Sequence, residues 1–227
     1  MFVSQKHVFW QALLITILIF GIGVVVGVLL ENMRIGKVEA MFESSEINLV
    51  DVRLQSEIYA SGDFDCESAV KENTKFADKI FEEAKVLSRY EEASRLKTED
   101  LAIWHKKYDL LRTTLFLNSL KIKEKCESSY SNVVYFYNYA NPSLDTRAKQ
   151  NVFSRILGEL KKKKGDEILL IPIAGNNNVT AVNLLLDKYD IDEEDLPVIV
   201  IDEKIKLREL ETVKEIEKYF DKDFENL

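Results

Sequence analysis

The 227-residue sequence has few of the residues that most often carry chemistry, with two cysteines and two histidines. Its three prolines and eight glycines exclude collagen-like and Pro/Gly-rich disordered chains. The net charge is -8, from 31 basic and 39 acidic side chains, so no positive footprint for nucleic acid is present. His7 and His105 lie far apart, and two cysteines without a nearby histidine do not complete a metal site. We therefore predict no metal, no cofactor, no nucleic-acid partner and no catalytic residue, which favours a protein that is not an enzyme.

One long apolar run lies near the N-terminus. Residues 8–30 contain no charged side chain, and a helix of that length spans about 34 Å, more than the ~30 Å hydrocarbon core of a bilayer. A cleaved signal peptide is the alternative, but its apolar segment has about 7 to 15 residues. We predict a single transmembrane anchor at residues 1–34, in the cell membrane and in contact with its lipid bilayer. Within it, Gly23 and Gly27 form a small-xxx-small pair that lets two such helices pack closely.

The residues after the anchor follow a heptad spacing of alternating three and four residues. This pattern predicts a helical stalk that ends at about residue 59, before the breaking sequence at 61–63. Two interpretations remain open: a weak coiled coil between two copies, giving a homodimer, or packing of the stripe on the chain's own next helices. The heptad positions are Ile35, Val38, Phe42, Ser45, Leu49, Val52, Ser56 and Tyr59.

Two amphipathic helices follow, separated by a turn near residue 97. Cys66 lies about 30 residues before this turn and Cys126 about 30 residues after it, so both reach the same end of an antiparallel hairpin. We predict a Cys66–Cys126 disulfide, which stabilises the fold by roughly 4 kcal/mol on the chain-entropy model; two unpaired buried thiols are the alternative. The stalk and stapled hairpin form a predicted domain at residues 35–126. A disulfide favours an oxidising, extracytoplasmic compartment, whereas the charges flanking the anchor leave its orientation open.

From residue 127 short apolar runs alternate with amphipathic helices. Strands joined by crossover helices are parallel, and the last two strands form a hairpin, so residues 127–227 are predicted to form a mixed sheet with helices on both faces. The fold class of the chain is α+β or α/β, with the helical anchor, stalk and hairpin preceding the sheet. The expected strands are 133–137, 168–174, 198–201 and 204–209, and the expected helices are 144–163, 180–189 and 212–220.

This order of elements resembles the thioredoxin fold over about residues 131–222. The resemblance includes Leu196-Pro197-Val198 at the start of the third strand and the helix that follows the final hairpin. It implies a cis peptide bond at Pro197, for which a trans proline that begins a strand is the alternative. It also implies an edge that accepts an extended peptide, which we place at Tyr139, Asn141, Pro142 and Leu196.

The sequence departs from that family at its reactive motif. Thioredoxin-like oxidoreductases carry Cys-x-x-Cys between the first strand and the next helix, where the helix N-terminus lowers the thiol pKa. Residues 138–145 correspond to this stretch and contain no cysteine. The resemblance therefore implies a redox-inactive domain, and we predict a protein-binding module that acts in assembly or as a chaperone, with an unidentified protein partner. The alternatives are a membrane-bound thiol-disulfide oxidoreductase that uses Cys66 and Cys126, and a structural homo-oligomer held by the anchor and stalk helices.

One further motif lies outside these predictions. Asn178-Val179-Thr180 matches the acceptor sequence for N-linked glycosylation, which is compatible with an external domain. Such triplets also occur often by chance.

Overall fold

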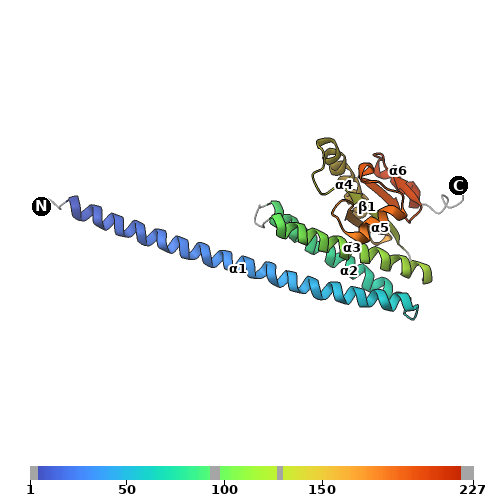
Figure 1. The fold of residues 1–227 in the computed structure, drawn as a ribbon, viewed down its shortest axis with the longest axis horizontal. Coiled ribbons are helices and arrows are strands. Elements are labelled where there is room, and N and C mark those ends of the chain that lie inside the picture. Colours follow the sequence, from blue (N-terminus) through green and yellow to red (C-terminus); the bar gives the residue numbers. More distant parts are fainter. Residues whose placement is uncertain (1–4, 93–97, 127–129, 221–227) are drawn as a thin grey trace. The chain divides into compact units, whose positions relative to one another are not determined.

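The computed structural model describes residues 5–92, 98–126 and 130–220 (Figure 1). Side chains are described for these residues except 5–7, 34–45, 89–92 and 98–100. The described chain is mostly helical and contains one small mixed sheet. Its contacts divide it into two units, Met1–Asp51 and Val52–Leu227.

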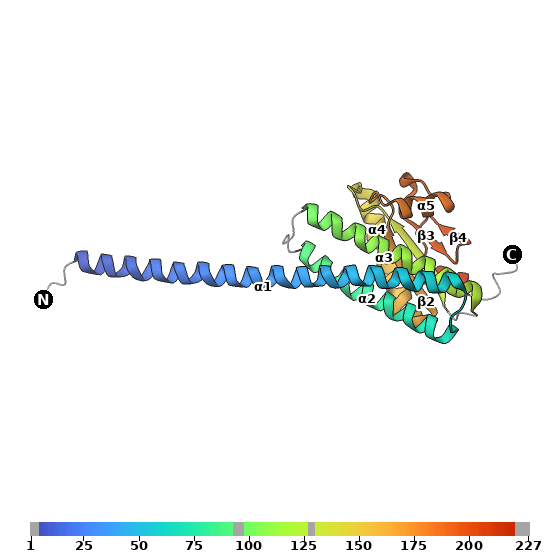
Figure 2. The ribbon, with the colours of Figure 1, turned by 60° about the horizontal axis from the view of Figure 1, so that its bottom comes forward.

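Helix α1 (Gln5–Ser61) is continuous (Figure 2) and includes the apolar segment found in the sequence. By length and composition, Val8–Met33 is long and apolar enough to cross a membrane. The helix ends before Gly62, whose φ of +72° is a left-handed conformation that glycine adopts without steric cost. Within the described part of the chain, nothing beyond the helix's own nearby backbone lies within 4 Å of a Cβ built at Gly23 or Gly27, and their packing against a second helix stays a prediction.

Of the four predicted stalk seam positions with described side chains, three lie in the second unit, at residues 52, 56 and 59. Val52 and Tyr59 are buried within the second unit. The ammonium group of Lys121 on α3 donates to the backbone oxygen and the hydroxyl of Ser56, at 2.9 and 2.8 Å. At these three positions the heptad stripe packs on the chain's own helices. The seam positions Ile35, Val38, Phe42 and Ser45 lie outside the residues with described side chains.

Helices α2 (Cys66–Glu92) and α3 (Thr98–Lys125) form the expected antiparallel hairpin. Each contributes buried apolar residues at helical spacing, and the phenol of Tyr108 on α3 donates to the Glu83 carboxylate on α2 at 3.4 Å. Burial raises the pKa of Glu83. The buried apolar residues of the pair, among those with described side chains, are Ala69, Phe76, Ile80, Leu87, Trp104, Tyr108, Leu111, Leu115, Phe116 and Ile122.

The sheet has four strands in the order β2-β1-β3-β4. Strand β1 pairs in parallel with β2 and antiparallel with β3, and β3 pairs antiparallel with β4, so the sheet is mixed as predicted. The strands are β1 (Ser131–Tyr137), β2 (Ile168–Ala174), β3 (Val198–Ile201) and β4 (Ile205–Leu207). The helices around them are α4 (Leu144–Lys164), η1 (Gly165–Glu167), α5 (Thr180–Lys188), η2 (Glu193–Asp195), α6 (Val213–Glu217) and η3 (Lys218–Phe220).

Helices cover both faces of the sheet. Alternate residues of β1 point to opposite faces. Tyr135 packs with Phe153 of α4 and Ile216 of α6 in one core, whereas the ring of Phe136 lies 6.5 Å from that of Tyr189, which follows α5. Phe116 of α3 lies 6.3 Å from Tyr189. Helix α3 contacts α2 as well as β1 and β2, and Figure 1 shows it between α2 and the sheet.

Helix α3 joins the hairpin to the sheet. The domain boundaries after residues 34 and 126 stay predictions, and the contacts group all of Val52–Leu227 in one unit. The physical reason is that α3 is buried on two sides, against α2 on one side and against β1, β2 and α5 on the other.

Candidate functional site

The structure pairs Cys66 with Cys126, which confirms the predicted disulfide, with Cα atoms 5.7 Å apart. Cys66 is the first residue of α2 and is partly buried, whereas Cys126 directly follows α3 and is 6% exposed. The α1–α2 turn is fixed beside them, because the ammonium group of Lys125 donates to the Phe64 carbonyl at 2.7 Å and lies 4.2 Å from the centre of that ring. Hydrogen bonds from Ser68 lower the pKa of Asp65.

Helix α3 runs along the whole sheet. Asp109 reaches the last residue of β2, where its Oδ1 accepts the Ala174 N–H at 3.0 Å. Lys123 reaches the β3–β4 turn beside the start of β1, where its ammonium group lies 2.6 Å from the Asp202 carboxylate. The helical rise between these two residues is about 21 Å, close to the length of a seven-residue strand. The disulfide, beyond Lys123, therefore lies at the opposite end of the sheet from residues 138–145.

Asn176 holds the loop after β1 against the loop after β2. Its Oδ1 accepts the backbone N–H groups of Tyr139 and Ala140, at 2.7 and 3.1 Å. Its Nδ2 donates to Asn138 Oδ1 at 2.9 Å and to Glu193 Oε1 at 3.0 Å. Loops fixed in this way are ordered before a partner arrives, which lowers the entropic cost of binding.

The residues that follow this loop begin α4 and present an apolar side chain. Ser143 caps the helix, and its Oγ accepts the Thr146 N–H at 3.1 Å. Asn141 has a φ of +55°, which asparagine tolerates better than most residues. Leu144, the first residue of α4, has 83% of its surface exposed, the largest fraction among the large apolar residues that the structure describes.

The structure brings together three of the four predicted edge residues. Tyr139, Asn141 and Pro142 lie on the β1–α4 loop, and each is at least partly exposed. The centroid of the Tyr139 ring lies 4.0 Å from the centroid of the His105 ring on α3. The loop and the hairpin therefore meet at this end of the sheet.

The fourth predicted edge residue, Leu196, is 5% exposed. Its side chain fills the space beside Gly175, where a Cβ would lie 2.7 Å from Leu196 Cδ1. Its N–H donates to the Glu193 carbonyl at 3.3 Å. Leu196 thus presents neither its side chain nor its N–H to a partner, although the Leu196–Pro197 bond is cis.

Asp109 is a buried carboxylate on α3 that belongs to no recognisable sequence motif. Its side chain is 1% exposed, and its Oδ2 accepts the Asn177 side-chain amide at 2.7 Å. Burial raises the pKa of Asp109 despite these hydrogen bonds and the nearby Arg112, whose Nη1 is 3.8 Å away. Asp109 therefore links α3 by hydrogen bonds to the carboxyl end of β2 and to the loop that follows it.

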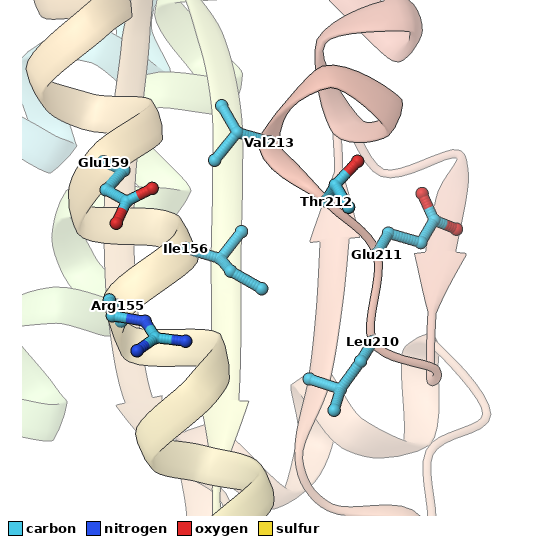
Figure 3. Close-up of a pocket in the computed structure, with 7 residues that line it drawn as sticks. All are labelled: Arg155, Ile156, Glu159, Leu210, Glu211, Thr212 and Val213. Atoms are coloured by element: carbon cyan, nitrogen blue, oxygen red, sulfur yellow. The ribbon is translucent and has the colours of Figure 1, made fainter.

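A surface pocket of about 420 Å³ lies between α4 and the segment before α6, away from the loop at 138–145 (Figure 3). It is formed by α4 and the segment that leads into α6, with Ile156, Leu210 and Val213 as its apolar lining and Arg155, Glu159 and Glu211 as charged residues around it. The Tyr219 hydroxyl donates to Glu211 at 3.1 Å. Among the described residues, no group of three or more His, Cys, Asp and Glu side chains is arranged to hold a metal ion.

Comparisons of the chain with protein-family models, with curated proteins and with solved structures gave no match.

Proposed function

We propose that residues 131–220 form a thioredoxin-like domain that binds an extended protein segment and performs no thiol chemistry at its binding edge. Two features support the fold: the strand order β2-β1-β3-β4, and the parallel β1–β2 pair beside antiparallel β3 and β4. The cysteine-free stretch 138–145 occupies the position of that family's reactive motif.

The binding surface is the loop after β1 together with the first residue of α4. The observation that carries the proposal is the 83% exposure of Leu144 on a loop that Asn176 holds in place. Neighbouring apolar side chains that form a contiguous exposed patch on an ordered backbone are typical of protein-interaction sites. Tyr139 and Pro142, both half-buried, extend this surface on the side of α3.

The domain is proposed to stand outside the cytoplasm on a single membrane anchor. Val8–Met33 supplies a helix of sufficient length and apolarity. The disulfide supports the proposed extracytoplasmic position, because such bonds persist in oxidising compartments.

The oxidoreductase alternative has one observation in its favour, the partial exposure of Cys66. Against it, the disulfide lies at the opposite end of the sheet from the loop at 138–145. The reduction potential separates the two proposals: a structural disulfide has a potential below about -300 mV, and an exchanging one a higher potential. A Cys126→Ala chain that accumulates mixed disulfides with a protein partner through Cys66 would favour exchange.

The binding surface is tested by photo-crosslinking in native membranes. A benzophenone amino acid replaces Leu144 in the full chain, and matched chains carry it at Leu184, on α5, or at Leu210, in the pocket of Figure 3. We expect one dominant protein adduct from position 144 that maps to a single segment of the partner. Cys66→Ala/Cys126→Ala should retain that adduct. Equal adducts from all three positions, or none from 144, would contradict the proposed surface.

A further inference from the structure

Three consecutive asparagines follow β2, and the structure gives them different environments. Asn176 joins the two loops through its side-chain amide, as described above. Asn177 is 7% exposed and donates to the buried Asp109. Asn178 is exposed, and its side chain makes no hydrogen bond to any residue that the structure describes.

Asn178 is also the only asparagine of the chain in an N-x-Ser/Thr sequence with x other than proline. Asn141 is followed by Pro142 and Ser143, and the proline excludes that triplet. The backbone at Asn178 has a φ of +53°, and the residue is exposed in the short connection between the turn after β2 and the first residue of α5. Thr180, which supplies the hydroxyl of the motif, is exposed at the first position of α5, and its side chain does not cap the helix.

From this exposure and sequence we infer that Asn178 is an acceptor for an N-linked oligosaccharide. The inference rests on the proposed extracytoplasmic position of the domain, where such transfer takes place. The co-reactant is an oligosaccharide linked to a lipid pyrophosphate. The Asn178 Nδ2 forms a bond to the anomeric carbon of the first sugar, the bond from that carbon to the pyrophosphate oxygen breaks, the amide loses one proton, and the lipid pyrophosphate leaves.

The glycan would stand at the carboxyl end of β2, the same end of the sheet as Leu144. It would therefore border the proposed binding surface without covering Asn176 or Asn177, whose side chains face inward. Val179, between the two residues of the motif, is 7% exposed and is the residue directly before α5.

The test is synthesis of the full chain in the presence of microsomes that contain the lipid-linked oligosaccharide. We expect one slower-migrating species that an N-glycosidase removes. Asn178→Gln and Thr180→Ala should abolish it, and Thr180→Ser, which keeps a hydroxyl, should retain it.

A control acceptor separates failure of the site from failure of the orientation. Asp190→Asn with Asp192→Thr creates the motif in the loop after α5, where both residues are exposed. Asp190 has a φ of +50°, which asparagine tolerates, and a threonine retains an N-cap side chain for η2. An unmodified Asn178 in a chain whose control acceptor is modified would overturn the inference alone. Absence of both modifications would overturn the inference together with the proposed orientation.

Discussion

At the scale of single residues, Asp109 joins α3 to the sheet through hydrogen bonds to its buried side chain. Its carboxylate accepts two hydrogen bonds in a site where it is 1% exposed. Removing an acceptor from buried donors costs about 1–3 kcal/mol for each unpaired group. Asp109→Ala is therefore expected to weaken the docking of α3 much more than a substitution of an exposed carboxylate.

The raised pKa of Asp109 predicts a pH dependence of stability. Because the folded state binds this proton more tightly than the unfolded state, the stabilisation is fully present below the ordinary pKa of 3.8 and is lost as the pH rises through the raised value. Asp109→Asn keeps the shape of the side chain and does not titrate. We expect the unfolding free energy of the natural chain, minus that of the variant, to fall as the pH rises from about 3.8 to the raised pKa of Asp109 and to level off above that pKa. Urea unfolding of the full chain in detergent, followed by the fluorescence of the buried Trp104, measures the difference; a constant difference would contradict the account.

Gly175 is required by the packing of its neighbour. An alanine Cβ would meet the buried Leu196 side chain at 2.7 Å, so Gly175→Ala is expected to destabilise the fold by about 1–3 kcal/mol. Gly158→Ala is the matched control, because nothing lies within 4 Å of a Cβ there and alanine favours the helix by about 1 kcal/mol. A double-mutant cycle with Leu196→Ala should recover part of the loss at 175. Equal effects at 158 and 175 would count against this packing.

At the scale of elements, the disulfide closes the hairpin at the end where the chain enters the sheet. The two cysteines are 60 residues apart, and the chain-entropy model gives about 4 kcal/mol for such a loop. In urea unfolding, Cys66→Ala/Cys126→Ala is expected to have a free energy of unfolding lower by this amount. A reductant should lower the free energy of unfolding of the natural chain to a similar value and leave that of the variant unchanged. A loss below about 1 kcal/mol would contradict a stapling role.

Much of the element order could be predicted from local patterns. The expected strands 168–174 and 198–201 coincide with β2 and β3, because uninterrupted apolar runs bounded by turn residues are typical of buried strands. The predicted strand 204–209 is shorter in the structure, since Lys204 closes the turn with a hydrogen bond to the Ile201 carbonyl and pairing begins at Ile205. The predicted helix 212–220 begins at its Thr212 cap, and its last turn is a 3₁₀-helix.

The contact of α3 with the sheet could not be predicted in the same way. Asp109 lies near Lys106, Lys107 and Arg112 in the sequence, and such charges are typical of a solvated helix face. Its partner at Ala174 is 65 residues away and depends on how two predicted domains pack. The cysteines were predictable because their equal distances from one turn are a local property of the hairpin. Asn176 gave no such signal, since its role depends on loops that meet only in the folded sheet.

At the scale of the whole molecule, we propose a membrane anchor that carries a binding domain outside the cytoplasm. In this proposal Val8–Met33 is the anchor, the disulfide indicates an oxidising compartment, and the loop around Leu144 contacts the partner. Whether two copies associate through Gly23 and Gly27 stays a prediction, and cross-linking within α1 in membranes tests it.

Thiol labelling in intact cells examines the sulfur chemistry and the side of the membrane together. A membrane-impermeant maleimide is applied before and after a membrane-impermeant reductant, and modified cysteines are identified by mass spectrometry. We expect no modification of Cys66 or Cys126 before reduction and modification of the partly exposed Cys66 after it. Modification without reductant, or protection from both reagents until the cells are opened, would contradict an anchored, disulfide-stapled domain outside the cytoplasm.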